Sequence, residues 1–333
     1  MSAVATKALL ELDGLSVDYV LGDRSVRAVD NVSLSIAPGE ILGLAGESGC
    51  GKSTLASAVL QILKPPAEVS GGRIIFQGQD LVAMSREDLR RVRWRHVSLV
   101  FQSAMNVLNP VMRVGDQFVD MYRAHDRHVR KNEALARAGD LLELVGIERS
   151  RVRSYAHELS GGMRQRVVIA MALALEPELI VMDEPTTALD VVVQREILQE
   201  LEELKRRLGF AVLFITHDLS LLVEFSDRIA IMYAGEIVES AASDVLFRHA
   251  LHPYTNGLMS SFPPLTGPIL PLTGIAGAPP DLGNPPTGCR FHPRCQQCTG
   301  IDSNLHRLQT GVRPLLREIE PGHQVACHWV EGP

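Results

Sequence analysis

The chain has 333 residues, of which 46% are hydrophobic and 22% charged, and its net charge is -6 at pH 7. This composition is typical of a globular protein with one large domain, or one domain and an appendage. The negative charge provides no basic footprint for nucleic acid. Residues 1–12 lack the features of a secretory signal, and the longest apolar run, residues 167–175, is far short of the roughly 20 residues that span a bilayer. We therefore expect no secretory signal and no membrane-spanning segment in these regions.

The first part of the chain predicts strands followed by a nucleotide-binding loop. Strand-like alternation occurs in four segments: residues 9–13, 15–19, 32–36 and 41–45. The last of these ends at Gly46, a glycine-rich loop follows, and residues 53–63 predict a helix that stops before Pro65-Pro66. The order of strand, glycine-rich loop and helix indicates an α/β nucleotide-binding core.

A helical segment interrupts this core. Helical periodicity dominates from about residue 86 to residue 174, most clearly at residues 135–145 and 164–175. Later segments predict two strands, a charged helix between them and a hairpin around Ala234-Gly235: residues 179–182, 192–208, 211–216, 228–233 and 236–239. Dense Pro and Gly from 253 to 286 predict an irregular linker, and a cysteine-bearing tail follows.

The glycine-rich loop carries the clearest chemistry. Its sequence fits the phosphate-loop pattern G-x-x-x-x-G-K-S: Gly46, Glu47, Ser48, Gly49, Cys50, Gly51, Lys52 and Ser53. Glycines allow successive backbone N–H groups to point at phosphate oxygens, and the following helix adds its positive dipole end. We expect Lys52 to bridge the β- and γ-phosphates, Ser53 to hold Mg²⁺, Thr54 to belong to the nucleotide site, and Cys50 to be a small filler.

An acidic strand end supplies a second part of such a site. The apolar residues 179–182 are followed directly by Asp183 and Glu184. Asp183 is a candidate ligand of Mg²⁺ through water. Glu184 is a candidate catalytic residue, because a carboxylate facing the γ-phosphate can polarise the attacking water or accept its proton.

The segment Leu159-Ser160-Gly161-Gly162-Met163-Arg164-Gln165-Arg166 resembles the signature motif of ABC ATPases. The resemblance covers nearly the whole chain. It implies a P-loop NTPase (RecA-like) α/β core with an antiparallel β subdomain and a helical insertion, plus a small irregular C-terminal extension. It also implies an ATPase domain over residues 1–248, with its helical subdomain at about 103–174, and an extension over 249–333.

The same resemblance implies roles for further residues. Tyr19 matches the aromatic residue that stacks on adenine, and Gln102 matches the glutamine that senses Mg²⁺. Asp190, in Ala188-Leu189-Asp190, matches the loop that crosses the dimer interface, and His217 matches the switch histidine at the γ-phosphate. Ser160, Gly161 and Gly162 would cover the ATP that a second subunit holds, since a phosphate loop alone leaves one side of the γ-phosphate open.

The tail points to a class of ABC ATPase. Leu251-His252-Pro253-Tyr254-Thr255, the segment from Gly288 to Cys295, and the segment from Gly322 to His328 resemble the extension of oligopeptide and dipeptide importer ATPases. This implies a peripheral ATPase subunit at the cytoplasmic face of the inner membrane, energising uptake of di- or oligopeptides. Its partners would be a second ABC ATPase (a paralogue or a second copy), two membrane-spanning permease subunits and an extracytoplasmic substrate-binding protein.

Three alternatives to peptide uptake are considered at this stage. The same motor could serve uptake of nickel chelates or oligosaccharides, because membrane subunits and the binding protein choose the cargo. A soluble ABC ATPase acting on nucleic acid is disfavoured, since such proteins usually carry two cassettes or a long coiled coil. A regulatory protein with a vestigial cassette is disfavoured by Glu184 and His217. Residues 103–113, next to Gln102, are our candidate docking surface for a membrane subunit, and the alternative is a loop that packs on its own core.

Four cysteines in the tail suggest a metal site. Cys289, Cys295, Cys298 and Cys327 are spaced C-x5-C-x2-C-x28-C, and four thiolates suit tetrahedral Zn²⁺ or an iron–sulfur cluster. In the peptide-importer group this region is associated with a 4Fe–4S cluster, which we favour over Zn²⁺. His292 and His328 are alternative ligands.

Overall fold

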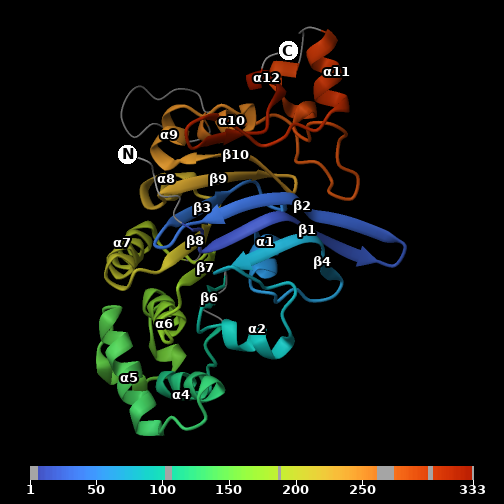
Figure 1. Cartoon of the computed structure of the whole chain (residues 1–333). Helices are drawn as coiled ribbons and strands as arrows, with labels where there is room; N and C mark the ends of the chain where they lie inside the picture. Colours follow the sequence, from blue (N-terminus) through green and yellow to red (C-terminus); the bar gives the residue numbers. More distant parts are fainter. Residues whose placement is uncertain (1–6, 102–106, 187–188, 261–273, 299–302, 332–333) are drawn as a thin grey trace. The chain divides into compact units, whose positions relative to one another are not determined.

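The computed structural model in Figure 1 describes residues 7–101, 107–186, 189–260, 274–298 and 303–331. The chain divides into two compact units. The first combines Met1–Ala83 with Ile215–Pro333, and the second is Met84–Phe214. The first unit is therefore assembled from both ends of the chain, so that residues far apart in sequence share one fold.

An antiparallel sheet opens the first unit. Its strands are β1 (Leu10–Leu21), β2 (Arg24–Ile36), β4 (Ala67–Phe76) and β5 (Gln79–Asp80), in the order β2-β1-β4-β5. Val32, Leu34 and Ile36 of β2 are buried while the residues between them are exposed, which is the alternation that makes a strand with one covered face. The sequence analysis did not predict β4, whose Ser70-Gly71-Gly72 breaks the apolar pattern.

A second group of strands in the first unit carries the phosphate loop. β3 (Ile41–Ala45) is buried throughout and runs parallel to β9 (Arg228–Tyr233), as expected for a strand covered on both faces. β9 turns into β10 (Glu236–Ala242) through Ala234 and Gly235, which both have positive φ, at 47° and 89°. This confirms the predicted hairpin, because two successive left-handed residues form the tight turn that antiparallel strands favour.

The C-terminal extension continues this sheet. β12 (His323–Val325) pairs with β10 and with β11 (Arg317–Glu320), both antiparallel. Its helices are α10 (Pro253–Ser260), α11 (Ser303–Gly311) and α12 (His328–Glu331). The prediction of an irregular linker was therefore wrong for residues 253–260, where proline occupies the first helical position that tolerates it.

The described residues of the first unit also form the α-helices α1 (Lys52–Val59), α8 (Leu219–Phe225) and α9 (Ser243–Arg248). α1 begins within the predicted phosphate loop and contacts β1 and β2. It ends earlier than predicted, because Gln61 takes a left-handed φ of 52° and turns the chain out of the helix.

In the residues that the structure describes, the second unit contains three strands and a group of helices. β6 (Val97–Val100), β7 (Leu179–Asp183) and β8 (Ala211–Ile215) follow the order β8-β7-β6, and β6 runs parallel to β7. The helices are α2 (Arg86–Val92), α4 (Val114–His125), α5 (Lys131–Leu144), α6 (Gly161–Leu173) and α7 (Val191–Leu208). The predicted helices at 135–145, 164–175 and 192–208 are thereby confirmed. β6 was missed, because four residues are too few to interrupt a helical period.

Local signals in α7 explain its extent. Its buried residues Ile197, Leu198, Leu201 and Leu204 form one apolar stripe. The helix ends at Gly209, whose φ of 77° is a left-handed C-cap.

In the described part of the chain, no helix is both long and apolar enough to cross a membrane.

Candidate nucleotide-binding site

The phosphate loop connects β3 to α1 and depends on glycine at two positions. Gly46 has φ 153°, and a Cβ placed there would lie 2.1 Å from the Met232 carbonyl oxygen. Gly51 has φ 110°, and its Cβ would lie 2.3 Å from the Ala28 carbonyl oxygen. Both obstacles are backbone atoms of neighbouring strands, so a side chain at either position would force the loop out of place.

The lysine of the loop is buried against the loop's own backbone. Lys52 is 7% exposed, and its Nζ donates hydrogen bonds to the carbonyl oxygens of Gly46 at 2.6 Å and Glu47 at 3.0 Å. The ammonium group is thus fixed within the loop, with its charge available to an anion. Cys50 is buried beside it, and burial raises the pKa of the Cys50 thiol. Cys50 is therefore a neutral packing residue.

The start of α1 brings two further predicted residues together. Ser53 is exposed at the second position of the helix, in the turn that carries the positive end of the helix dipole. The Thr54 hydroxyl lies 3.1 Å from the Tyr19 hydroxyl, within hydrogen-bonding distance. Tyr19, on β1, is thereby held next to the end of the phosphate loop, although the two are far apart in sequence.

Glu184, the candidate catalytic carboxylate, has an uncommon backbone conformation. Asp183 ends β7, and Glu184 directly after it has φ 46°. A left-handed φ costs a residue with a Cβ roughly 1–2 kcal/mol, and such conformations concentrate at functional sites. The turn redirects the chain after the strand.

His217, the predicted switch histidine, is exposed between β8 and α8. It belongs to the first unit.

The signature residues and Asp190 begin two helices of the second unit. The Ser160 hydroxyl accepts the Met163 N–H at 3.2 Å and caps α6, while Asp190 Oδ1 accepts the Val193 N–H at 3.0 Å and caps α7. A Cβ on Gly162 would lie 2.8 Å from Val193 Cγ1, so the two helix starts touch. Gly161 is the first residue of α6. The first N–H groups of any α-helix have no acceptor within the helix, because no preceding turn exists. Gln102, Ala188 and part of the predicted docking surface, 103–106, lie outside the described residues.

Sequence analysis missed two residues of the extension that contact the phosphate loop. The Tyr254 hydroxyl accepts the backbone N–H of Glu47 at 2.9 Å. Arg294 pairs with the Glu47 carboxylate through Nη1–Oε2 at 2.6 Å and Nη2–Oε1 at 3.0 Å. No local pattern could reveal these contacts, because 207 and 247 residues separate the partners in sequence.

The tail cysteines do not form a ligand set as the structure places them. Within the described segments, no group of three or more His, Cys, Asp and Glu side chains is positioned around one metal ion. Burial raises the pKa of Cys289 to about 12 and that of Cys327 to about 11, and Cys295 lies close enough to both to add to the rise. The Sγ of Cys298 instead lies 3.6 Å from Nδ1 of His306. The arrangement does not support the predicted metal site.

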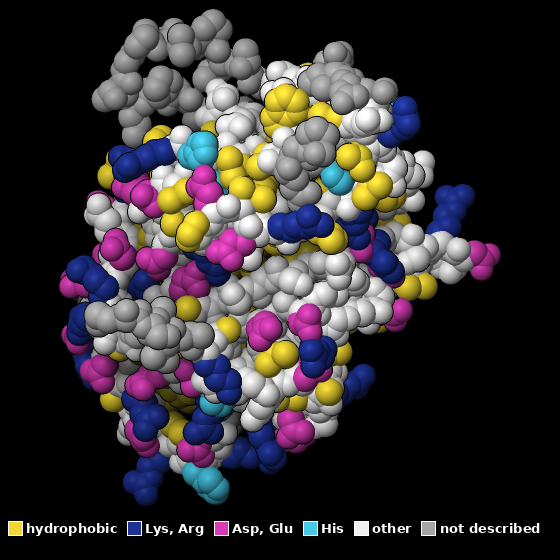
Figure 2. All heavy atoms as spheres, turned by 45° about the horizontal axis from the view of Figure 1, so that its top comes forward, with side chains coloured by type: hydrophobic (Ala, Val, Ile, Leu, Met, Phe, Trp, Pro, Cys, Tyr) yellow, Lys and Arg dark blue, Asp and Glu magenta, His cyan; other side chains and the backbone are white. Residues whose placement is uncertain are grey.

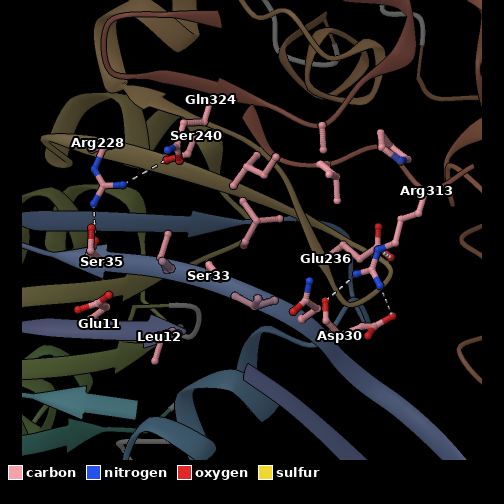
Figure 3. Close-up of a pocket in the computed structure, with 18 of the residues that line it drawn as sticks. Glu11, Leu12, Asp30, Ser33, Ser35, Arg228, Glu236, Ser240, Arg313 and Gln324 are labelled. Atoms are coloured by element: carbon pink, nitrogen blue, oxygen red, sulfur yellow. Dashed lines mark hydrogen bonds and ion pairs between the residues drawn. The ribbon is translucent and has the colours of Figure 1, made fainter. Parts of the chain in front are cut away.

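A pocket lies in the first unit, apart from the phosphate loop. It encloses about 660 Å³ between β2, β10 and the extension, and Figure 3 shows the side chains that line it. At one end Arg313 pairs with Asp30 at 3.0 Å and with Glu236 at 2.9 Å, and Arg290 pairs with both acids as well. At the other end Arg228 donates to Ser240 and Ser35. The pairs that Arg290 and Arg313 make with Asp30 fasten the extension to the first sheet, whereas Arg228 links β9 to β10 and β2.

The surface carries charges of both signs. On the face shown in Figure 2, basic and acidic side chains are interspersed with hydrophobic ones, and neither sign forms a continuous area over the described residues. Together with the net charge of -6, this face offers no stripe for a nucleic-acid backbone.

Comparisons with known proteins agree with the motifs. Residues 29–187 match the family described as ABC transporter, and residues 238–301 match the family described as oligopeptide/dipeptide transporter, C-terminal region. A dipeptide transport ATP-binding protein, DppD, of Caldanaerobacter subterraneus is 37% identical over 97% of this chain and 97% of its own. An oligopeptide transport ATP-binding protein, OppD, of Bacillus subtilis is 43% identical over 95% of this chain and 92% of its own.

A solved structure shares the fold. The ATP-binding cassette MJ0796, described as a dimer in a post-hydrolysis state bound to ADP and phosphate, superposes with a TM-score of 0.63. It is 28% identical in sequence, and the match covers 70% of this chain and 98% of that one. The predicted P-loop NTPase fold with an ABC cassette is therefore confirmed.

Proposed function

The chain belongs to the ABC transporter family, among the oligopeptide and dipeptide transport ATP-binding proteins, and we propose that it hydrolyses ATP to drive import of di- and oligopeptides. The observation that carries the proposal is the conformation of the phosphate loop. Lys52 is held within it at 2.6 Å from the Gly46 carbonyl oxygen, and two of its glycines have no room for a side chain. Such a loop binds the phosphates of a nucleotide through backbone N–H groups and one fixed ammonium.

The residues of the motifs take separate roles in this proposal. Lys52 and the loop N–H groups bind the β- and γ-phosphates, and Tyr19 stacks on the base. Ser53, Asp183 and Gln102 would hold Mg²⁺, which would supply positive charge at the phosphate oxygens when bound. Glu184 positions and deprotonates the attacking water, and His217 contacts the γ-phosphate. These assignments rest on the family motifs at matching positions.

A second ATPase subunit completes each site. Ser160, Gly161 and Gly162 cover the nucleotide that the partner's phosphate loop holds, and Asp190 lies in the loop that crosses the dimer interface. The exposed position of Ser160 at the start of α6 supports this, because the N-terminus of a helix attracts phosphate. ATP thereby joins two subunits, and its hydrolysis separates them.

The partners and location follow from the family. We propose that the chain is peripheral to the cytoplasmic face of a cell membrane, where two permease subunits and an extracytoplasmic binding protein work with it. Peptide cargo is supported by the relatives that are transport proteins for dipeptides and oligopeptides. Uptake assays with labelled peptides, nickel chelates and oligosaccharides, using a strain that lacks this chain, would assign the cargo.

Substitution of Glu184 tests the catalytic proposal. Purified Glu184→Gln protein should bind Mg²⁺-ATP as well as the unaltered chain, yet hydrolyse it at least about 100-fold more slowly, because only the general base is removed. Persistent hydrolysis by this variant would refute the assignment, and absence of ATP binding by the unaltered chain would refute the function itself. Glu202→Gln, at an exposed position of α7, is a matched control.

The tail cysteines carry a separate proposal that the ATPase chemistry does not need. We propose a 4Fe–4S cluster, or alternatively Zn²⁺, bound by Cys289, Cys295, Cys298 and Cys327, and the number and spacing of these residues support it. Binding would require Cys298 to leave His306. Iron and zinc analysis with a visible spectrum, after anaerobic purification, tests this, and a metal-free protein would refute it.

A further inference from the structure

Glu47 is an acidic residue inside a loop built for anions. It is the second residue of the phosphate loop, and its side chain is 25% exposed. A carboxylate beside a bound triphosphate repels it, and the repulsion grows where water is partly excluded. Neutralisation of this charge should therefore strengthen phosphate binding.

Arg294 of the extension supplies the opposite charge. Its two terminal nitrogens meet the two carboxylate oxygens of Glu47 at 2.6 Å and 3.0 Å. This two-bond geometry is the strong and directional form of an arginine–carboxylate pair. Pairing with Glu47 raises the pKa of Arg294, so the guanidinium stays charged.

The guanidinium is held in place by its own surroundings. Arg294 Nε donates to the Ala276 carbonyl oxygen at 2.9 Å, and the group lies 5.8 Å from the Tyr233 ring centre and 6.0 Å from that of Phe291. Only 5% of the side chain is exposed. A charge fixed in this way loses little entropy when it acts on the loop.

Tyr254 contacts the same loop residue from a second direction. Its hydroxyl accepts the Glu47 backbone N–H at 2.9 Å. The tyrosine is fully buried, with its ring 4.5 Å from that of Tyr233 and 5.4 Å from that of Phe291, measured between centres. Burial raises the pKa of Tyr254, so its hydroxyl remains neutral. Backbone and side chain of Glu47 are thus both held by the extension.

We propose that Arg294 and Tyr254 are positioning residues for ATP, through which the C-terminal extension sets the charge and conformation of the phosphate loop. Arg294 cancels the charge of Glu47, and Tyr254 fixes the first peptide of the loop. Removal or displacement of the extension would therefore weaken nucleotide binding. The inference rests on the proposed ATP-binding function.

The test is a charge-matched mutant cycle on the full chain. Calorimetric titration with Mg²⁺ and the non-hydrolysable analogue AMP-PNP measures affinity, and steady-state assays measure KM and kcat for ATP. The variants are Arg294→Gln, Arg294→Lys, Glu47→Gln, the double variant and Tyr254→Phe. Arg307→Gln, at an exposed position of α11, is the control for loss of an arginine from the extension.

Arg294→Gln should weaken AMP-PNP binding about ten-fold, which corresponds to about 1.4 kcal/mol. The same change in the Glu47→Gln background should weaken it less than about two-fold, because no carboxylate is left to neutralise. Arg294→Lys and Tyr254→Phe should each cost about three-fold, since lysine cannot make both bonds and phenylalanine leaves the Glu47 N–H unpaired. KM should rise with affinity loss while kcat stays within about two-fold.

Equal losses from Arg294→Gln in both backgrounds would overturn the proposal, as would unchanged affinity in the single variant. If Arg294→Gln does not fold, Glu47→Gln decides alone. It removes the repulsive charge and should bind AMP-PNP at least as tightly as the unaltered chain, and a ten-fold weaker affinity would overturn the proposal. Absence of binding by the unaltered chain would instead refute the ATPase function.

Discussion

Glu239 and His323 form a buried hydrogen bond between β10 and β12, with Oε1 of the acid 2.7 Å from Nε2 of the histidine. Their side chains are 0% and 1% exposed. The same carboxylate accepts the N–H groups of Leu251 at 2.6 Å and His252 at 3.0 Å. One buried acid thereby joins the end of the cassette to the start and the end of the extension.

Removal of this acid should loosen the extension. Glu239→Ala leaves buried donors unpaired and should lower the free energy of unfolding by about 3–5 kcal/mol, whereas Glu239→Gln keeps an acceptor and should cost about 1–3 kcal/mol. Urea unfolding followed by near-ultraviolet circular dichroism measures both. Glu202→Ala, on an exposed face, should change stability by less than about 0.5 kcal/mol. Equal effects of all three would contradict the role of Glu239.

His252 should make the protein sensitive to acid. The side chain is 1% exposed, burial lowers the pKa of His252 to about 4, and its Nδ1 accepts the Tyr254 N–H at 3.0 Å. Because the unfolded histidine titrates near 6.5, the unfolded state binds more protons between these values. Stability is therefore complete above about pH 6.5 and falls as the pH drops toward 4, by about 2–4 kcal/mol from this group.

Urea unfolding across that pH range measures the effect, with His252→Asn as the comparison. Asparagine can accept the same N–H without titrating, so its stability curve should be flatter by the contribution of His252. A slope that is the same in both proteins would show that His252 does not titrate on unfolding.

Two glycines of the phosphate loop should differ in their tolerance of alanine. Gly46→Ala places a Cβ 2.1 Å from the Met232 carbonyl oxygen and should abolish nucleotide binding. A Cβ on Gly49 meets nothing within 4 Å, so Gly49→Ala should cost only the roughly 1–2 kcal/mol of a left-handed residue. AMP-PNP titration and thermal unfolding measure the difference. Equal losses of AMP-PNP affinity and stability in the two variants would mean that backbone conformation, and not the space for a Cβ, requires glycine at both positions.

The shared-site proposal predicts complementation between two inactive variants. Lys52→Ala disables a subunit's own phosphate loop, and Ser160→Arg disables the cover it gives to a partner. If the chain pairs with itself, an equal mixture contains mixed dimers with one intact site, and ATPase activity should recover to about a quarter of the unaltered level. Each variant alone should be inactive. No recovery, with both variants folded and able to associate, would exclude self-pairing.

Short, contiguous patterns were predicted well. The hairpin was predicted at residues 228–239 because Ala234-Gly235 carries its own turn signal, and α7 was predicted because its apolar stripe and its glycine end are local. β4 and β6 were missed, since the first is interrupted by Ser70-Gly71-Gly72 and the second has four residues inside a long helical region. Strands of this kind gain their stability from neighbouring strands, which a local pattern does not contain.

The phosphate loop and the signature motif could be predicted from sequence because their chemistry needs consecutive residues, with glycines and a lysine at set spacing before a helix. Tertiary structure alone decided which distant side chains act on that loop. Tyr254 and Arg294 reach Glu47 across 207 and 247 residues of chain. These contacts form because the β10–β12 pairing and the buried aromatic rings hold the extension in place. Packing of this kind depends on the whole fold and not on any local pattern.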